Sequence, residues 1–333
     1  MHARGMLCAA VMLCLAANAA RTQDPLFTMQ ALQPLTLNPA LTGGEGKYRA
    51  SFGHRSQWRS LGVPFLTNTA AFDMRIVDSD AGALSVGLMF MGDRAGDPAF
   101  TTSQFNLSLA YTLRISDNAR LSAGLNLAYD QRGVQAGAGQ WASQYNGVSY
   151  DPGTPSGEAF GDERLSSLHA GPGMVYSYDN TGKNRRGSKN VKVTAGASVA
   201  QIGDLEVTRA NAVRHDFNAR ITIFANAAFD LGDGGLGLEP LMTYVNQGNF
   251  DIFMTGALLR YAILDSGGFA SNAKPLYVAA GPYWRVNEAV AAAARLHWGD
   301  YILGLSYDFI VSDITRAVSQ IGAWEVSVVY AVN

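Results

Sequence analysis

The chain has 333 residues, 16% of them charged, with a formal net charge of −2, and this excludes the clustered Lys and Arg footprint of a nucleic-acid-binding domain. A charged share well below the roughly 25% of soluble domains, with no long apolar run, is typical of a membrane barrel, whose outside is apolar and whose lumen is polar. A soluble sandwich or barrel remains the alternative at the level of composition.

Residues 1–20 have the pattern of a secretory signal peptide. A positively charged start is followed by an apolar run over 6–17 and by the cleavage pattern Ala17-Asn18-Ala19. A lipoprotein signal that uses Cys14 is the weaker alternative. Cys14 and Cys8 are the two cysteines of the chain and both lie in this segment, so we expect an exported chain with no disulfide and no cysteine-bound metal.

Residues 21–46 form a separate N-terminal segment. Asp24 as N-cap and Pro25 as the first helical residue predict a short helix through Leu32. The prolines and paired glycines that follow exclude a continuous helix or a central strand. We expect this segment to act as a plug that packs in or across the periplasmic mouth of a barrel formed by residues 47–333.

From residue 47 onward the chain repeats one pattern of short alternating strands between turns. In 105–115, for example, the odd positions are apolar and the even positions are small or polar. Such a second face suits a wet or plugged lumen better than a dry sandwich core. No stretch after residue 20 reaches the ~18 apolar residues of a membrane helix, so a chain that crosses a membrane must do so as a closed barrel.

Fourteen segments carry this pattern, an even number, as bacterial single-chain barrels require. They are 47–58, 64–77, 82–93, 101–115, 119–132, 166–178, 190–202, 217–231, 234–245, 250–264, 274–286, 289–298, 301–311 and 321–332. Short turns and long loops alternate between them, and short turns are periplasmic in outer-membrane barrels. We therefore predict an all-β fold, a transmembrane antiparallel β-barrel of about 14 strands in the outer membrane with both termini periplasmic.

Two features need an explanation beyond this pattern. Pro172 and Pro282 fall inside predicted strands, where each removes a ladder hydrogen bond. The longest loop, 133–165, carries Trp141, Tyr145 and Tyr150 with many glycines. Loops of this length are functional or disordered, and we interpret its aromatic residues as a surface for a partner, with folding back over the barrel mouth as the alternative.

Motifs for chemistry are weak. The glycine pattern over 232–237 follows a strand but precedes another apolar segment and no helix, so it predicts a hairpin and no nucleotide site. His169 near Ser166 and Ser167 is the only hint of a membrane hydrolase. No G-x-S-x-G or H-E-x-x-H motif occurs. We expect no enzyme activity, no cofactor and no metal.

Runs at both ends of the chain resemble the PorP/SprF family of outer-membrane proteins of Bacteroidota. The resemblance rests on Asn38-Pro39-Ala40, Arg55-Ser56-Gln57-Trp58, Ala280-Gly281-Pro282-Tyr283-Trp284-Arg285, Tyr307-Asp308-Phe309 with Ser312-Asp313, and Trp324-Glu325-Val326-Ser327. It spans the mature chain, whereas the middle, including loop 133–165, matches only as a pattern.

The resemblance implies a component of the type IX secretion and gliding motility machinery. Its implied partners are periplasmic ring lipoproteins and a secreted adhesin recognised through its C-terminal signal domain. The candidate contacts with partners or with the plug are Asn38, Pro39, Ala40, Arg55, Gln57, Trp58, Trp141, Tyr145, Tyr150, Asp308, Ser312 and Asp313. The strand pattern puts Arg55 and Gln57 on the lumen face, in position to anchor the N-terminal segment.

Two other functions stay open. A plugged outer-membrane transporter or pore for small solutes has the same expected fold, and an openable lumen would distinguish it. A membrane hydrolase is the weaker candidate, and it requires an activity that depends on His169.

Overall fold

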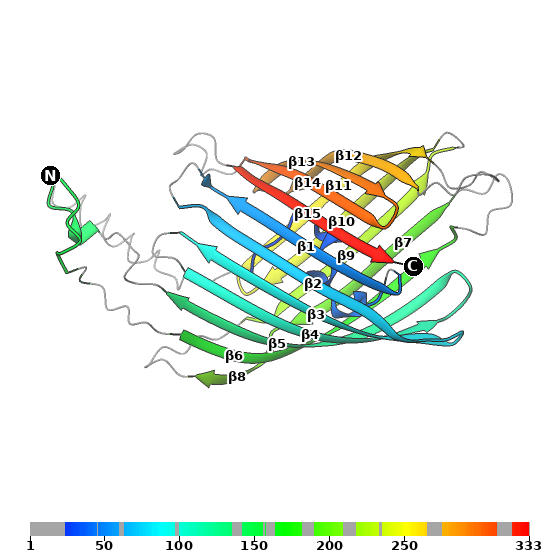
Figure 1. The fold of residues 1–333 in the computed structure, drawn as a ribbon, viewed down its shortest axis with the longest axis horizontal. Helices are drawn as coiled ribbons and strands as arrows, with labels where there is room; N and C mark the ends of the chain where they lie inside the picture. The colour runs from blue at the N-terminus through cyan, green and yellow to red at the C-terminus, as the bar shows by residue number, and fades with distance from the viewer. Residues whose placement is uncertain are drawn as a thin grey trace.

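Alternating apolar and small or polar residues build strands that pair into a closed antiparallel β-barrel, seen from the side in a computed structural model (Figure 1). The structure describes residues 24–44, 46–59, 63–96, 100–134, 142–155, 157, 164–181, 190–208, 218–232, 235–264, 275–311 and 322–332, with the backbone alone for 134, 164 and 204–208. Among these residues no helix is long and apolar enough to span a membrane, a result without bearing on strands.

The described sheet has fifteen strands, each antiparallel to its neighbours. They are β1 (Tyr48–Gln57), β2 (Phe65–Asp78), β3 (Gly82–Ala95), β4 (Phe100–Arg114), β5 (Ala119–Val134), β6 (Arg164–Asp179), β7 (Val191–Ala200), β8 (Ile202–Thr208), β9 (Arg220–Asp230), β10 (Leu236–Gln247), β11 (Phe250–Leu264), β12 (Leu276–Arg285), β13 (Ala289–Trp298), β14 (Tyr301–Ile310) and β15 (Gly322–Val332).

The sheet closes because β1 pairs with both β2 and β15, while β5 pairs with β6. Among the described residues, β8 pairs with β6 alone and continues the line of β7. The two segments together take the place of one strand, interrupted at Gln201, whose φ is +60°. The barrel therefore has fourteen strands, which confirms the predicted fold and count.

Side chains alternate between an apolar outer face and a lumen of small and polar groups. On β4, Phe105, Leu107 and Leu109 are about half exposed on the outside, while Ser108 and Ala110 are buried inside. An apolar outside and a polar lumen are what a barrel in lipid requires, since hydrocarbon replaces water against the outer face.

Each proline inside a strand lies where the hydrogen-bond ladder to one neighbouring strand is interrupted. Pro172 of β6 lies between the pairing with β7, which starts at Gly173, and the pairing with β8, which reaches Ala170. The β11–β12 ladder skips Pro282 and the β9–β10 ladder skips Pro240. The hydrogen bonds that proline cannot donate are thus missing where the neighbouring strand has also left the regular register.

The two ends of the barrel differ. One is the short-turn end, where β2 joins β3 through 79–81 and where the last described residue, Val332, lies (Figure 1). The other is the long-loop end, where β5 connects to β6 over the predicted long loop, which contains the helical turn η5 (Ala142–Gln144). Most connections alternate as expected from the sequence. The exceptions include the short turn between β10 and β11 at the long-loop end and the long connections 180–190 and 265–275 at the short-turn end.

The N-terminal segment lies inside the barrel as three short helical turns, drawn in dark blue in Figure 1: η1 (Gln30–Leu32), α2 (Pro34–Leu37) and η2 (Pro39–Leu41). The predicted helix through Leu32 is wrong. The backbone N–H groups of Thr28 and Met29 donate to the carboxylate of Glu325, at 2.7 and 2.9 Å. These bonds replace the intrahelical ones, because a backbone donor has one bond to give.

The segment also lies deeper in the lumen than the predicted position in or across a mouth of the barrel. Asp24 contacts Arg132 and Arg220, which lie at the long-loop ends of β5 and β9. From there the segment crosses the lumen, and Gly43 reaches Asp73 in the other half of β2. Asp24 and Val332 therefore lie at opposite ends of the barrel, while the termini, for which a shared periplasmic side was predicted, fall outside the described residues.

Candidate functional site

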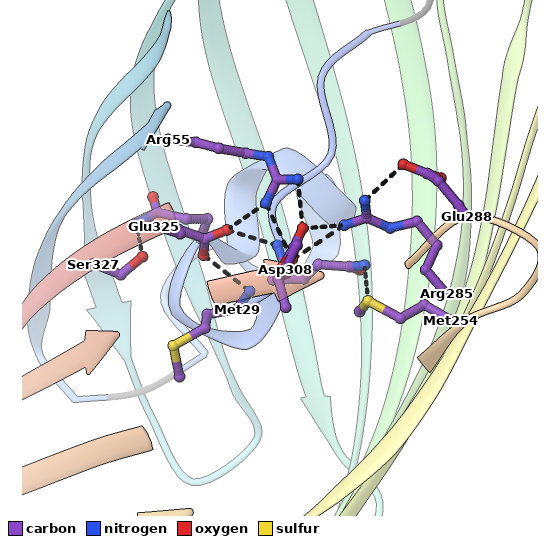
Figure 2. A network of polar contacts seen from close by, with 11 residues as sticks. Met29, Arg55, Met254, Arg285, Glu288, Asp308, Glu325 and Ser327 are labelled. Atoms are coloured by element: carbon purple, nitrogen blue, oxygen red, sulfur yellow. Dashed lines mark hydrogen bonds and ion pairs between the residues drawn. The ribbon is translucent and has the colours of Figure 1, made fainter. Parts of the chain in front are cut away.

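A buried ion network fixes the start of the N-terminal segment to the barrel wall (Figure 2). Arg55 of β1 pairs with Asp308 of β14 at 2.6 Å and with Glu325 of β15 at 3.3 Å, and each of these side chains is at most 2% exposed. Arg285 of β12 lies on the far side of Asp308, at 3.6 Å, and also pairs with Glu288. Two arginines thus neutralise the two buried carboxylates.

Thr28 is the residue of the segment that this network encloses. Its hydroxyl accepts hydrogen bonds from Arg55 and Arg285, each at 3.1 Å, and donates to Asp308 at 2.8 Å. With the two N–H bonds to Glu325, the network satisfies the hydroxyl of Thr28 and the backbone N–H groups of Thr28 and Met29. Arg55 therefore does anchor the segment, and Gln57, with its amide oriented to accept, supports the Arg55 guanidinium at 3.0 Å.

A second anchor holds the segment at the long-loop end. The carboxylate of Asp24 accepts a hydrogen bond from Gln201 at 2.8 Å and lies 3.4 Å from Arg132 and 3.6 Å from Arg220. Gln247 joins Gln201 at 2.9 Å and accepts from the Asp24 N–H. The left-handed backbone at Gln201 interrupts the strand and re-aims this amide, as bulges do.

The family-like run Asn38-Pro39-Ala40 sits against β5, β6 and β7. The Asn38 amide donates to the carbonyl groups of Met174 and Ala197, at 3.2 and 2.8 Å, while its oxygen caps η2 through the N–H of Ala40. The wall leaves room for this run because it is glycine there. A Cβ on Gly124 would lie 2.4 Å from the Ala40 nitrogen.

Replacing Gly124 by valine is therefore expected to displace the η2 turn and cost about 1–3 kcal/mol, the usual range for overpacking. The measurement is limited proteolysis of the purified barrel, which should cut the N-terminal segment faster in the variant. Gly92→Val is the matched control, because a Cβ there meets only a phenylalanine ring at 3.4 Å. Equal cleavage rates for both variants would contradict the seat described for Asn38 to Ala40.

The segment leaves the lumen through contacts with β1, β2 and β4. Thr42 donates to Ser108 at 2.9 Å, and the Gly43 N–H donates to Asp73 at 2.9 Å. Asp73 also pairs with the buried Arg49 at 2.8 Å, and Arg49 donates to the carbonyl group of Leu41. Charged and polar wall residues thus hold the segment along its whole described length.

Below the segment, on the short-turn side, the lumen is hollow. A cavity of about 1840 Å³ is lined by the short-turn halves of the strands and is roofed by Ala31, Leu32, Pro34 and Leu37 of the segment. We call this cavity the vestibule. The segment therefore occupies the long-loop half of the lumen, and the short-turn half contains the vestibule.

The other predicted site residues have separate places. Trp58 packs on Phe65, with ring centroids 4.7 Å apart. Among the described residues, no contact joins Trp58 to the N-terminal segment. Tyr145 and Tyr150 pair across a small hairpin of the long loop, and the Tyr150 hydroxyl donates to Gln144. Trp141, Ser312 and Asp313 lie outside the described residues.

Several residues that hold the segment were not among the predicted site residues, among them Asp24, Thr28, Arg285 and Glu325. The sequence carried a signal for Arg285 and Glu325, because each is the lone charged residue on the lumen face of an otherwise uncharged strand. Thr28 and Asp24 had no such signal, because their partners lie far away in the sequence.

The hydrolase hint does not assemble into a catalytic arrangement in the described residues. His169 lies 3.2 Å from Asp130, both almost fully buried in the barrel wall. The Ser166 hydroxyl accepts from Tyr129 instead, and Ser167 Oγ has no hydrogen-bond partner there. A nucleophile needs a hydrogen bond to its base. Within the same residues, no group of three or more metal-ligating side chains forms.

Comparison with known proteins gives a family and distant structural likenesses. The family model described as "Type IX secretion system membrane protein PorP/SprF" matches residues 19–330. No curated protein matches the chain.

Solved structures similar to this chain include three membrane proteins with very low identity. The Pseudomonas putida toluene transporter TodX has 9% identity, covers 93% of this chain and 94% of its own, and has a TM-score of 0.46. A Pseudomonas aeruginosa FadL homologue has 11% identity, with 89% and 93% covered and a TM-score of 0.45. The translocator domain of the autotransporter NalP from Neisseria meningitidis has 12% identity, with 91% and 94% covered and a TM-score of 0.40. Likenesses this distant do not bear on function.

Proposed function

This chain belongs to the PorP/SprF family of type IX secretion system membrane proteins, and from this premise we propose that it is a non-enzymatic adaptor of that system. Its barrel holds a secreted protein, by the C-terminal signal domain of that protein, at the cell surface. Its opposite end contacts the periplasmic ring lipoproteins. The system that it serves is either secretion or gliding motility.

The observation that carries this proposal is the fixed N-terminal segment. Its buried charges and hydrogen bonds keep the long-loop half of the lumen filled. A barrel that is closed in this way has two free ends and no described passage between them. Two ends without a passage suit a protein that links partners on either side of a membrane better than one that conducts solutes.

The long-loop end supports a contact with a secreted protein. Its hairpin exposes an apolar tip, Val148, at 88%, next to the half-exposed ring of Tyr145. An Asn146 turn holds the tip, since the Asn146 side chain accepts from the N–H groups of Val148 and Ser149. A rigid hairpin with an exposed apolar tip is the kind of feature that enters a pocket on a partner.

Crosslinking in cells tests this function. A photo-reactive residue at Val148 should capture a secreted protein through its C-terminal domain, and one at Ala81, in the exposed turn after β2, should capture ring lipoproteins. The matched control is Leu125, on the lipid-facing side of β5, which should give lipid adducts alone. Lipid adducts from all three positions in actively secreting cells would contradict the proposal.

The vestibule supports a second candidate, a plugged transporter or pore for small solutes. A cavity of about 1840 Å³ at the short-turn end exceeds what most small ligands need. This candidate requires the N-terminal segment to move in response to a solute. The conductance measurement described in the Discussion separates the two candidates.

A further inference from the structure

The vestibule is a blind cavity that is accessible from one end. Its lining reaches the short turns at Asp78, Gly235 and Gly299, and its roof is the N-terminal segment. Around it the β7–β9 ladder runs without a break from Val191 to Ala200, whereas the β9–β10 ladder skips Glu239, which lines the cavity. An occupant that comes from the short-turn side enters through the short-turn mouth.

The mouth of the vestibule carries a pair of neighbouring arginines. Arg114 of β4 and Arg120 of β5 lie directly opposite each other in the ladder, and both line the cavity. Like charges in directly opposite positions destabilise a sheet. Arg114 contacts the carboxylate of Asp80 at 3.7 Å. Asp80 is fully exposed, so water screens this interaction. The pair thus favours an anion in the vestibule.

Charges elsewhere in the vestibule do not cancel this pair. On the opposite wall, Arg260 contacts Asp230 and Glu239, and Arg295 contacts Glu239, so those carboxylates are already used. In all, eight basic and five acidic residues line the cavity, and Arg49 is neutralised by Asp73 behind the lining. The lining is thus net positive, and Arg114 and Arg120 share the mouth with the carboxylates of Asp179 and Asp300.

The roof of the vestibule is apolar. It is formed by the surfaces of Ala31, Leu32, Pro34 and Leu37, with Leu41 beside them. A site with a basic mouth and an apolar blind end fits an extended chain that carries apolar residues first and acidic residues behind them. A cavity of about 1840 Å³ is too large for one small anion to fill, because ordinary ligand pockets measure about 300–1,000 Å³.

We propose that the vestibule binds an extended acidic peptide segment of a periplasmic protein, with its carboxylates on Arg114 and Arg120 and its apolar end against the roof. This inference rests on the proposed function, because it takes the short-turn end as periplasmic. It adds a binding site and the chemistry of the partner to the contact proposed for that end.

The test uses the purified full mature chain in detergent micelles and a peptide of two leucines followed by six glutamates, labelled with fluorescein. We expect binding by fluorescence anisotropy, weaker at high salt, and about tenfold weaker in the double variant Arg114→Gln/Arg120→Gln, as for close interfacial charge pairs. Arg94→Gln is the matched control, because Arg94 is an exposed arginine at the long-loop end of β3. It should leave binding unchanged.

Three results would overturn the inference: no binding by the wild-type chain, equal binding by the double variant, or displacement of the peptide by inorganic phosphate at similar concentrations. The last would mean a small-anion site. The proposed function is tested separately. Absence of a secreted protein from the Val148 crosslinks in cells contradicts that function, whatever the purified chain does with the peptide. Failure of the purified chain to bind the peptide, when the Val148 crosslinks in cells succeed, contradicts this inference alone.

Discussion

Replacing Arg55 by methionine is expected to destabilise the barrel by about 3–5 kcal/mol, the usual cost of removing one partner from a buried ion network. Asp308 and Glu325 would keep their burial, with at most 2% of each side chain exposed, but lose the cation between them. Thr28 would lose one of its two arginine donors. The measurement is urea unfolding of the purified protein, followed by the electrophoretic mobility of folded and unfolded barrels.

The control for this variant is Arg75→Met. Arg75 pairs with Asp78 at 3.2 Å, but the side chains are 22% and 52% exposed, and such pairs contribute about 0–1 kcal/mol. Its substitution should shift the unfolding midpoint only slightly. An Arg55→Met variant that unfolds at the wild-type midpoint would mean that water or a local shift neutralises the two carboxylates.

Deletion of residues 26–43 is expected to convert the closed barrel into an open pore. No strand pairing involves a residue before Tyr48, so the described ladders remain complete without the segment. The lumen would then be lined by the polar wall residues that now bind the segment, and it would fill with water. Planar bilayer recordings should show stepwise conductance for the deletion variant and none for the intact chain.

The same recordings decide between the two candidate functions. An intact chain that conducts when a solute is added would favour the transporter, since its segment must then move. A deletion variant that folds but stays closed would contradict the description of the segment as the plug. Folding is checked beforehand through the mobility shift used for Arg55→Met, so a failed fold is recognised.

Most of the fold follows from the sequence because the strand signal is local. Side chains on a strand alternate between two faces, and in lipid one face must be apolar. Each strand can therefore be identified from about ten consecutive residues. What escaped this reasoning is the interruption between β7 and β8. It depends on the left-handed backbone of Gln201. A non-glycine residue rarely prefers this conformation, and Gln201 is held in it by its contacts with Asp24 and Gln247.

The candidate site was predictable in part. The alternation in β1 gives the lumen face for Arg55, and the family resemblance singles out Asp308. The pairing of these two with each other and with Arg285 depends on strand register around the whole barrel, which no local pattern contains. The depth of the N-terminal segment was mispredicted for the same reason. Its donors at Thr28 and Met29 are satisfied by Glu325, almost 300 residues away.

These sequence separations have a consequence for how the barrel assembles. The seam that closes it joins β1 to β15, and the Arg55 network bridges that seam, since its members come from β1, β12, β14 and β15. The segment binds inside only when these strands have met, and their charges are neutralised only then. Seam closure therefore completes the ion network and the site that binds Thr28 and Met29, at a large loop-closure entropy cost. A barrel arrested before closure would hold unpaired charges at its open edge, and pairing these charges favours sealing.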